Sequence, residues 1–450
     1  MTTSTTTSSQ PGVHRAAVSG FHAGLDHAPQ LVVAPSGAAE VAGALALARE
    51  QDLAVTVVGR GHGHLRAIGE GMALLTTNLS GVEVDPAART ARIGAGTTWE
   101  QVLRATAPHA MAPLVGSAPD VGAVGYVLGG GLSPVGRTFG WASDHVRSFE
   151  VVTGGGQRLT ASPTENADLF WALRGGGGGG VVVTAMTVGL VEIATVYGGG
   201  LYFGAHDAET VVRTFASWSA TLPESFNTSF ALLRMPDLEV VPRPLRGQYV
   251  VHVRVTAVMD AAAAEKVLVP LRAAGTPVLD TLTDMPFGAI GSVHADPPGP
   301  SMSHTGGVLL RSFDAAAASA LLEVAGPGST LPLLGVELRV MGGALGRSGP
   351  YDDCVSGREA AAHLFVVTPP VLEPATEAPF VGAAGAVFEA MRPWATGGTT
   401  SNFHGILNQH LDLGHPWSRD TEARLTAVRR HHDPTGIVPP RVAARGAGGR

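Results

Sequence analysis

The sequence predicts an α+β fold made of two domains. Three observations predict it. A chain of 450 residues is long for a single domain. From Leu31 to about Thr195, short β-rich runs alternate with glycine turns. After about Tyr197 the glycine clusters become rarer, and helix-like segments with a 3.6-residue apolar period separate longer strand-like runs.

Composition limits the class of protein. The chain is 45% hydrophobic and 15% charged, which is typical of a compact globular protein with a large core. Its net charge of −7 and the lack of a basic tract argue against nucleic acid or an anionic membrane as partner. The single cysteine, Cys354, excludes an internal disulfide, which favours a reducing compartment. The sequence has no apolar stretch long enough to span a bilayer, so we expect a cytoplasmic protein.

The N-terminal half begins without the features of a signal peptide. Residues 1–28 open with "MTTSTTTSSQPG", which has neither a basic nor an apolar region, and we expect them to form a flexible tail. "LVVAP" (31–35) then predicts a strand, and "SGAAEVAGALALAREQ" (36–51) a helix with Ser36 as N-cap. The residues expected on its buried face are Val41, Leu45 and Ala48.

The next elements follow at short spacing. "LAVTVVG" (53–59) is a buried strand that leads into a loop with two histidines. "TTWEQVL" (97–103) predicts a helix with a capping box from Thr97 to Glu100. Its buried stripe should be Trp99, Val102 and Leu103. "FEVVT" (149–153) and "VVVTAMTVGL" (181–190) predict two further strands.

The C-terminal half has a different pattern. "AETVVRTFASW" (208–218) predicts a helix with Val211, Phe215 and Trp218 in register. "QYVVHVRVTAV" (248–258) and "LLGVELRVM" (333–341) predict strands of a sheet that such helices cover. "TEARLTAVRRHHDP" (421–434) is expected to be a helix that Pro434 ends.

Two glycine runs are candidates for cofactor contact. "VGAVGYVLGGGLSPVGRTFG" (121–140) and "RGGGGGGVVV" (174–183) offer backbone that can approach a planar ring or a diphosphate closely. Neither fits the spacing of a dinucleotide-binding Rossmann turn, and no Gly-Lys-Ser/Thr of a P-loop follows. The alternative is that both runs are flexible turns, in a glycine-rich structural protein without a cofactor.

The histidine loop "VVGRGHG" (57–63) raises a chemical question. His62 and His64 could be solvent-exposed loop residues, or a metal pair, but third and fourth ligands at a suitable spacing are missing, so we predict no metal site. A third use is covalent, because a neutral imidazole is a nucleophile near pH 7. Bare glycine neighbours would let such a ring reach the edge of a flat cofactor. No G-x-S-x-G elbow supports a hydrolase.

Together these motifs resemble the berberine-bridge-enzyme-like branch of the vanillyl-alcohol-oxidase family, whose FAD domain is of the p-cresol methylhydroxylase (PCMH) type. The resemblance runs from about Pro29 to Val438. It implies a two-domain FAD-binding PCMH-type fold with an antiparallel-sheet substrate domain covered by helices. The implied divisions are an FAD-binding domain (29–196), a substrate domain (197–395) and a C-terminal segment (396–450) that returns to the FAD domain.

The resemblance also implies the cofactor contacts. The family histidine that bonds to the flavin 8α-methyl falls on His62, and His64 lies outside the match. Ala118 stands where bicovalent relatives have cysteine, so the link should be through histidine alone. "TSNFHG" (400–405) matches the segment that places Asn402 near the flavin. The full set of implied contacts is Gly59, Arg60, Gly61, His62, Gly63, Ser117, Ala118, Val121, Gly122, Gly125, Tyr126, Gly129, Gly130, Gly131, Val183 and Asn402.

Two departures from the family pattern affect the site. Many relatives have Asn-Phe-Gly where this chain has Gly179, Gly180 and Val181, so we expect a looser loop there. Relatives often use a tyrosine as catalytic base two residues before the asparagine, and here that position is Thr400, whose hydroxyl is too weakly acidic. Possible replacements are Tyr126, Tyr202, Tyr351, His404 and Glu337, of which Tyr126, His404 and Tyr351 are our catalytic candidates.

The resemblance implies an FAD-dependent oxidase. A hydride would pass to flavin N5, a base would take a proton, and O2 would reoxidise the flavin. The implied substrate is a small organic molecule, such as a secondary metabolite or a sugar-like alcohol. The missing tyrosine leaves an alternative, a flavin-binding cyclase or isomerase without net redox.

Overall fold

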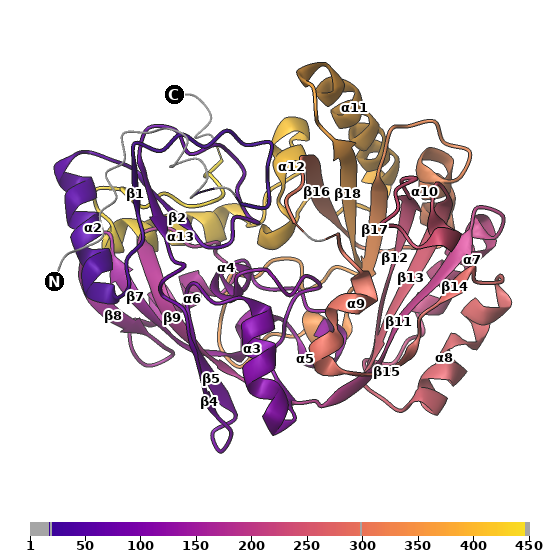
Figure 1. Cartoon of the computed structure of the whole chain (residues 1–450), viewed down its shortest axis with the longest axis horizontal. Coiled ribbons are helices and arrows are strands. Elements are labelled where there is room, and N and C mark those ends of the chain that lie inside the picture. Colours follow the sequence, from indigo (N-terminus) through magenta and orange to yellow (C-terminus); the bar gives the residue numbers. More distant parts are fainter. Residues whose placement is uncertain (1–17, 19, 298, 446–450) are drawn as a thin grey trace.

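The computed structural model describes residue 18 and residues 20–297 and 299–445. Most of the predicted tail, residues 1–17 and 19, lies outside the described residues. The part of it from Gly20 onward is built into the molecule. Phe21 stacks on the ring of His62, and His22 pairs with Ser301 in an isolated bridge. The described elements form two lobes, each around its own large hydrophobic core (Figure 1).

The first lobe is built from three small sheets. One is parallel, with the order β1 (Leu31–Val33), β3 (Met72–Leu75) and β2 (Val55–Val58). Another is antiparallel, with the order β4 (Val82–Asp85), β5 (Thr90–Gly94), β9 (Val181–Gly189), β7 (Val146–Thr153) and β8 (Arg158–Ala161). The third is a short pair, β6 (Met111–Ala112) and β10 (Val191–Glu192). These strands include all four that the sequence predicts in this half.

The helices of the first lobe bury the predicted stripes. They are α2 (Ala38–Glu50), α3 (Trp99–Thr106), α4 (Ala123–Leu128), α5 (Gly136–Phe139) and α6 (Ala167–Leu173). Helix α2 buries Val41, Leu45 and Ala48, and α3 buries Trp99, Val102 and Leu103. The apolar period of the sequence therefore fixes which face of each helix packs inward.

Both predicted helix caps are wrong by one residue. The N-cap of α2 is Gly37, and the backbone N–H of Ser36 donates instead to the carboxylate of Glu40 at 2.9 Å. At α3 the side-chain oxygen of Gln101 accepts from the backbone N–H of Thr98 at 2.9 Å. Thr97 is not free to cap, because its hydroxyl bonds to the backbone of Gly81. A tertiary contact thus decides between two adjacent threonines.

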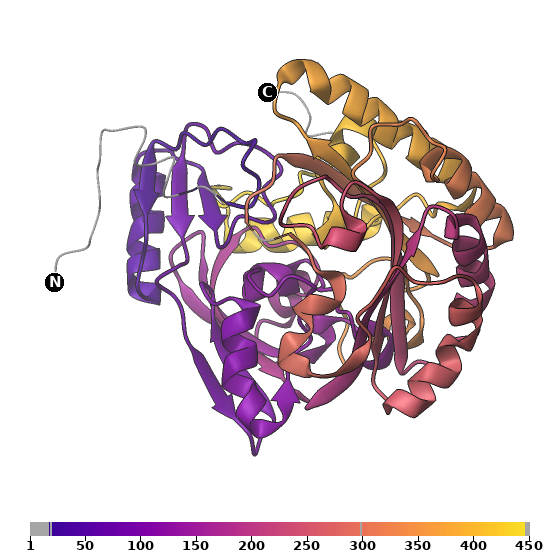
Figure 2. The same cartoon turned by 45° about the vertical axis from the view of Figure 1, so that its right-hand side comes forward.

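The second lobe is one antiparallel sheet with helices on one face (Figure 2). Its strand order is β14 (Leu279–Asp280), β11 (Thr195–Gly204), β13 (Tyr249–Ala257), β12 (Phe226–Arg234), β17 (Gly335–Val340), β18 (Ala362–Pro370) and β16 (Ser303–Leu310), and β15 (Thr283–Pro286) also pairs with β11. The covering helices are α7 (Ala208–Ser219), α8 (Ala261–Ala273), α10 (Ala315–Ala325) and α11 (Pro374–Met391). This arrangement confirms the predicted sheet covered by helices.

The two faces of this sheet differ because side chains alternate along a strand. Val253 and Val255 of β13, and Val336 and Leu338 of β17, join the core under the helices. The intervening side chains are polar and buried, and they occupy the face turned toward the first lobe. They include His252, Arg254, Thr256 and Glu337.

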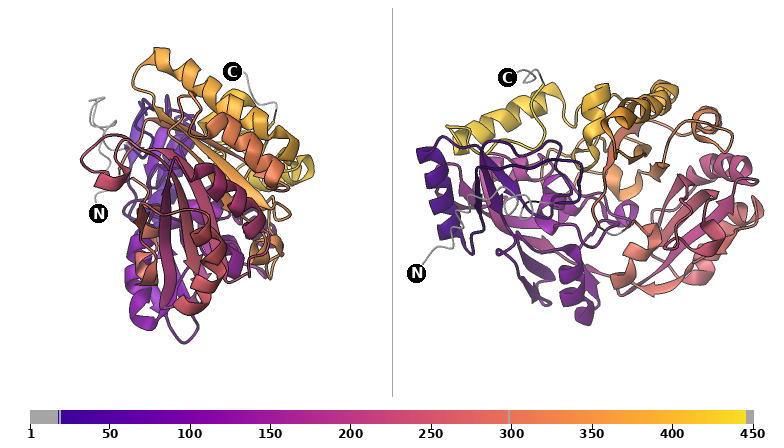
Figure 3. Two further views of the ribbon diagram at one scale, coloured as in Figure 1. Left: turned by 90° about the vertical axis from the view of Figure 1, so that its right-hand side faces the viewer. Right: turned by 45° about the horizontal axis from the view of Figure 1, so that its top comes forward.

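The C-terminal segment packs against the first lobe. Helix α13 (Arg419–His432) ends just before Asp433 and Pro434, and Leu425 and Val428 join the first core. The chain then runs beside β2, where the N–H of Val55 donates to the carbonyl of Ile437 at 2.6 Å. Figure 3 shows this yellow segment against the indigo and purple elements. Helix α12 (Ile406–Leu411) lies at β16 of the second lobe instead.

The first core also recruits a segment from the middle of the chain. Met285, Phe287, Ile290 and Val293, which precede or form the short helix α9 (Gly291–His294), pack into it. The two lobes are therefore joined by more than their covalent connections. In the described part of the chain, we find no helix that combines the length and apolar character needed to cross a lipid bilayer.

Candidate active site

The histidine loop leaves β2 at Val58 and places the ring of His62 in a half-buried setting. Nε2 of His62 lies 3.6 Å from Oδ2 of Asp120, and the ring stacks on Phe21 with centroids 4.7 Å apart. Both ring nitrogens are buried, and neither has a hydrogen-bond partner among the described residues. Burial lowers the pKa of His62, against the opposing effect of Asp120, so the ring is neutral at pH 7.

The glycines around His62 serve close backbone contacts. An added Cβ on Gly61 would lie 2.4 Å from Cα of Gly20, and φ there is +74°. Gly63 offers its carbonyl to the guanidinium of Arg441. A cavity of about 360 Å³ opens beside the loop. Its lining includes Arg60, Thr98, Arg104 and Asp120.

Asn402 holds the first of the two glycine runs, residues 121–140. Its Oδ1 accepts from the N–H of Gly131 at 2.8 Å, and its Nδ2 donates to the carbonyl of Tyr126 at 3.0 Å. A Cβ on Gly129 would lie 2.5 Å from this amide, and a Cβ on Gly131 would lie 2.6 Å from the Tyr126 ring. The glycine run is therefore packed on both sides and is not a flexible turn.

Tyr126 has an orphaned hydroxyl. The ring packs edge-on against Trp99, and its hydroxyl is buried with no hydrogen-bond partner in the described part of the chain. Burial raises the pKa of Tyr126, and the nearby guanidinium of Arg339 opposes this only in part. The phenol is therefore protonated at pH 7 and can donate one hydrogen bond.

The other predicted contacts lie in three settings. Ser117 donates its hydroxyl to Asp296 at 2.7 Å. Val121 and Gly122 join the start of α4 to α3, since the carbonyl of Val121 accepts from the N–H of Trp99. Val183 lies within the first core and pairs with Val151 on β7. The remaining positions have little or no side chain. Gly59 lies near Thr76, Gly130 lies beside Val355 and Trp141, and Gly125 is exposed on α4. The carbonyl of Ala118 accepts from the N–H of Val121.

The three catalytic candidates lie in different places. Tyr126 shares its setting with Asn402. His404 is buried on the side of Arg441 and His415, and burial, with Arg441, lowers its pKa to about 3. Tyr351 packs edge-on against Phe170, with Arg174 5.7 Å from its ring centre.

The second glycine run is held firmly, contrary to the expected looser loop. Arg429 of α13 donates to the carbonyls of Gly176 and Gly178, at 2.6 and 3.0 Å. The N–H of Gly180 donates to Val438 at 2.8 Å. A Cβ on Gly180, where φ is +76°, would lie 3.0 Å from the backbone of Arg429. Side chains at Gly179 and Gly180 would meet Pro440 and Arg429 of the returning C-terminal segment.

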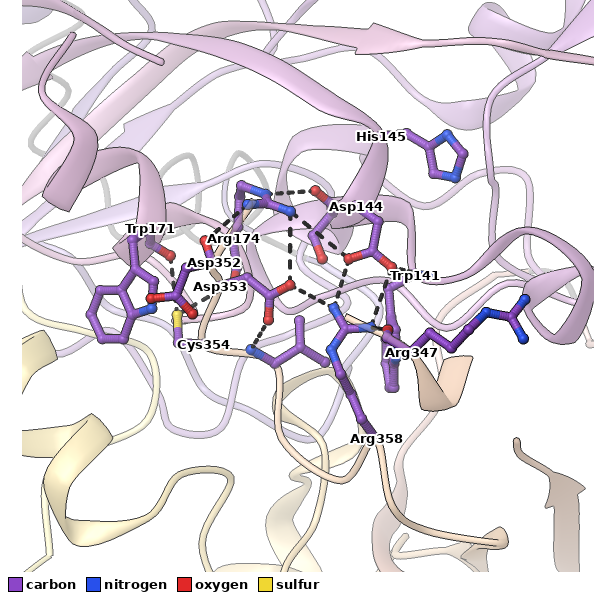
Figure 4. A network of polar contacts seen from close by, with 12 residues as sticks. Trp141, Asp144, His145, Trp171, Arg174, Arg347, Asp352, Asp353, Cys354 and Arg358 are labelled. Atoms are coloured by element: carbon purple, nitrogen blue, oxygen red, sulfur yellow. Dashed lines mark hydrogen bonds and ion pairs between the residues drawn. The ribbon is translucent and has the colours of Figure 1, made fainter. Parts of the chain in front are cut away.

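A buried ionic network fixes the start of this run (Figure 4). Arg174, whose side chain is 0% exposed, lies 3.8 Å from Asp144 and 3.7 Å from Asp353. Arg358 bridges the same two carboxylates at 2.6 and 2.5 Å. The network joins the loop 347–358 to the end of α6, and so sets where the glycine run begins.

Further orphaned groups lie in the segment before Asn402. The hydroxyls of Thr399, Thr400 and Ser401 are buried, and none of them has a partner within the described ranges. With the two nitrogens of His62 and the hydroxyl of Tyr126, they form a set of polar atoms without partners. Buried polar groups are normally paired, so such a set fits a bound polar molecule.

Sequence reasoning missed two groups of residues. Arg441 is partly buried and donates hydrogen bonds to the carbonyls of Gly63, Ser401 and His404. No local signal marks it. Arg254 and Arg339 occupy the polar face of the second sheet, and the alternation of charged with apolar residues in "VVHVRVT" and "GVELRV" could have identified them.

Comparison with known proteins identifies the first lobe. Residues 29–162 match the family of FAD binding domains. The FAD-dependent monooxygenase prx3 of Penicillium roqueforti is 33% identical over 195 residues, which are 42% of this chain and 38% of that protein. A VAO-type flavoprotein oxidase of Thermothelomyces thermophilus is 34% identical over 218 residues, 44% of this chain and 37% of that protein. The chain thus matches less than two fifths of the length of these relatives.

Solved structures resemble the whole chain. Physcomitrella patens BBE-like 1 superposes with a TM-score of 0.82, at 18% identity, over 96% of this chain and 94% of that chain. For 6-hydroxy-D-nicotine oxidase from Arthrobacter nicotinovorans, the TM-score is 0.80 at 19% identity, over 95% and 94%. For glucooligosaccharide oxidase from Acremonium strictum, described with a 6-S-cysteinyl, 8α-N1-histidyl FAD, it is 0.78 at 18% identity, over 95% and 94%. These likenesses confirm the predicted fold class.

Proposed function

From an FAD-binding domain at residues 29–162, set in the fold of the berberine-bridge-enzyme-like flavoproteins, we propose that this chain is an FAD-dependent oxidase of a small organic substrate. The observation that carries the proposal is the set of buried polar atoms without partners at His62, Tyr126 and Thr399–Ser401. They lie on segments that the sequence assigns to FAD contact or that adjoin Asn402. The chemistry that FAD supplies when bound is two-electron oxidation, with O2 as final oxidant.

We propose that His62 holds the cofactor covalently through the flavin 8α-methyl group. Its ring is neutral because burial lowers its pKa, and a neutral imidazole nitrogen is the nucleophilic form. Its nitrogens are not committed to any hydrogen bond among the described residues. Asp120, 3.6 Å from Nε2, is placed to accept a proton or to orient the ring. With alanine at position 118, the attachment uses the histidine alone.

Tyr126 is the catalytic candidate that we favour for contact with the substrate. It is bound through its carbonyl to Asn402, and its hydroxyl can donate a hydrogen bond to the substrate. Arg339, on the polar face of the second sheet, lies close enough to Tyr126 to oppose the rise in the pKa of its hydroxyl. Tyr126 therefore lies near that face of the sheet. Nδ1 of His404 is also buried without a partner among the described residues, but the pKa of this ring is lowered to about 3, and we propose that His404 is a positioning residue. Tyr351 packs edge-on against Phe170, and we propose that it is a core residue.

The covalent link is tested by acid precipitation of the purified protein. We expect flavin to stay with the wild-type precipitate and to appear in the supernatant for His62→Ala. His64→Ala is the matched control, because His64 is also buried in this loop but packs edge-on against His27. Flavin that remains with the His62→Ala precipitate would contradict the link, and a colourless protein would contradict the cofactor.

The redox assignment has its own test. Anaerobic addition of a substrate should bleach the visible absorbance of the flavin, and admission of O2 should restore it. Turnover without bleaching would support a flavin-binding cyclase or isomerase instead.

A further inference from the structure

A row of polar side chains crosses the second sheet at one level. Ser229 on β12 is directly opposite Arg254 on β13 and also directly opposite Arg339 on β17. Arg339 in turn is opposite His363 on β18. Residues opposite each other across neighbouring strands point to the same face and lie about 5 Å apart. Two guanidinium groups therefore flank one serine hydroxyl on the face turned toward the first lobe.

The charges in this row do not balance. Glu337 Oε1 lies 2.8 Å from Nη1 of Arg254 and 2.9 Å from Nε of Arg339, while its Oε2 lies 3.1 Å from Nη2 of Arg339. The three side chains are 10%, 7% and 12% exposed. One buried carboxylate thus serves two buried guanidiniums, and a net positive charge remains. An uncompensated charge away from water is costly, so the cluster favours an anion.

Neighbouring titratable groups do not remove this excess. Nε2 of His294 lies 3.5 Å from Glu337. Burial lowers the pKa of His294, so the ring is mainly neutral and does not offset the positive charge of the two arginines. Burial raises the pKa of Glu337, but Arg339 and Arg254 outweigh it and keep the group ionised. Asp296 also acts on Arg339. It is solvent-exposed and already accepts a hydrogen bond from Ser117.

A small cavity opens at the row. Its volume is about 30 Å³, and its lining includes Ser229, Arg254, Arg339, His294 and Ser133. Its wall therefore carries guanidiniums and hydroxyls, and Glu337 is not part of it. Ser229 is 3% exposed, and its hydroxyl has no hydrogen-bond partner in the described ranges. Room for about two water molecules suits the two oxygens of a carboxylate.

The cavity adjoins the proposed flavin contacts. Its wall at Leu132, Ser133 and Pro134 directly follows Gly131, which Asn402 binds. The guanidinium carbon of Arg339 lies 4.9 Å from the ring centre of Phe403, the residue after Asn402. The cavity is thus lined by residues that directly follow the segment bound by Asn402.

We propose that Arg254, Arg339 and Ser229 bind a carboxylate group of the substrate, so that the substrate of this chain is an organic acid. Glu337 and His252 engage the other guanidinium nitrogens, which leaves Nη1 of Arg339 and Nη2 of Arg254 to donate to the two oxygens of a carboxylate. Ser229 can donate a third hydrogen bond. This inference rests on the proposed function for its use as a substrate site. The binding site itself does not depend on the flavin chemistry.

Titration calorimetry of the purified holoenzyme with acetate and with its neutral isostere acetamide tests the site. We expect acetate to bind and acetamide to bind at least about tenfold more weakly, because only the anion compensates the guanidiniums. Arg339→Met should weaken acetate binding at least about tenfold, the effect of losing a hydrogen bond to a charged group. Ser229→Ala, a milder change, should weaken it about three- to tenfold.

Arg234→Met is the matched control. Arg234 ends β12 in the same sheet but donates to the carbonyls of Gly326 and Ser329 away from the cavity. Its variant should bind acetate as the wild type does. Equal binding of acetate and acetamide, or equal loss in Arg339→Met and Arg234→Met, would overturn the site. If Arg339→Met does not fold, unchanged acetate binding by Ser229→Ala would overturn it.

The outcomes also separate this site from the proposed function. A yellow protein that fails to bind acetate loses the carboxylate site but keeps its flavin assignment. A colourless protein that binds acetate through Arg339 keeps the carboxylate site, while the proposed oxidase is lost.

Discussion

At the scale of single residues, the site depends on side chains whose usual partners are missing. His62 and Tyr126 have buried polar atoms without a partner in the described part of the chain, while Arg441 has three partners but no carboxylate among them. Burial lowers the pKa of Arg441 to about 10, which still leaves it charged at pH 7. Its guanidinium joins the histidine loop to the segment that contains Asn402.

Replacement of Arg441 should therefore weaken both segments at once. We expect Arg441→Met to lower the free energy of unfolding by about 2–4 kcal/mol, because three carbonyls lose charge-assisted hydrogen bonds in a partly buried place. On the proposed function, the same variant should also incorporate flavin more slowly. Denaturant unfolding and the ratio of flavin to protein absorbance measure the two effects.

Arg311→Met is the control for this variant. Arg311 also donates only to carbonyls, those of Pro393 and Ala395, but it is exposed. Water can replace its bonds, so its loss should change little. Equal effects of the two variants would show that burial of Arg441 is not important.

At the scale of elements, the ionic network of Figure 4 anchors a loop of the second half to α6 of the first lobe. Arg174 and Arg358 share Asp144 and Asp353, and the side chains of all four are at most 14% exposed. The carbonyl of Arg174 also receives the N–H of Cys354 at 3.1 Å. The network and Arg429 together keep the glycine run at 175–180 in one conformation.

Breaking the network at one member should be costly. We expect Arg358→Met to lower the free energy of unfolding by about 3–5 kcal/mol, because it leaves buried carboxylates with only Arg174 as counter-ion. Arg347→Met, eleven residues earlier in the same loop, removes an exposed pair with Glu224. That variant should unfold at nearly the wild-type denaturant concentration. The comparison fails if both variants shift the midpoint equally.

At the scale of the whole molecule, several buried histidines make stability depend on pH. Burial is the main cause that lowers the pKa of His22 and His64 to about 4, and of His363 and His404 to about 3. Arg441 adds to this effect at three of them, and Arg339 at His363. These rings are neutral in the folded protein and become protonated near pH 6.5 once it unfolds.

The sign of the pH effect follows from this difference. Between about pH 4 and 6.5 the unfolded chain binds more protons, so folding stability should fall as the pH falls below about 6.5. Each such histidine contributes up to about 1.4 kcal/mol per pH unit. Carboxylates with lowered pKa values, such as Glu150 and Glu265, act only below about 4.5.

Thermal unfolding midpoints between pH 5.0 and 7.5 measure this effect. We expect them to decline below about pH 6.5, and His363→Gln should reduce the steepness of the decline. A flat profile over this range would contradict the neutral buried state of these rings.

Much of the fold could be predicted from the sequence because it depends on local patterns. The apolar period identified the buried faces of α2, α3 and α7, and alternating residues identified β13 and β17. The ordered motifs pointed to FAD, which the match over residues 29–162 supports. The cap predicted for α3 was wrong because the hydroxyl of Thr97 bonds to Gly81, a contact that neighbouring residues do not reveal.

The sequence by itself determined several of the segments that form strands and helices, and which cofactor the first lobe accepts. Only the tertiary structure decided that Asn402 binds the backbone of Tyr126, and that Arg254, Ser229 and Arg339 stand in one row. The physical reason is that secondary structure follows from residues a few positions apart. Strand register and buried charge balance depend on residues that are far apart in the chain and meet only on folding.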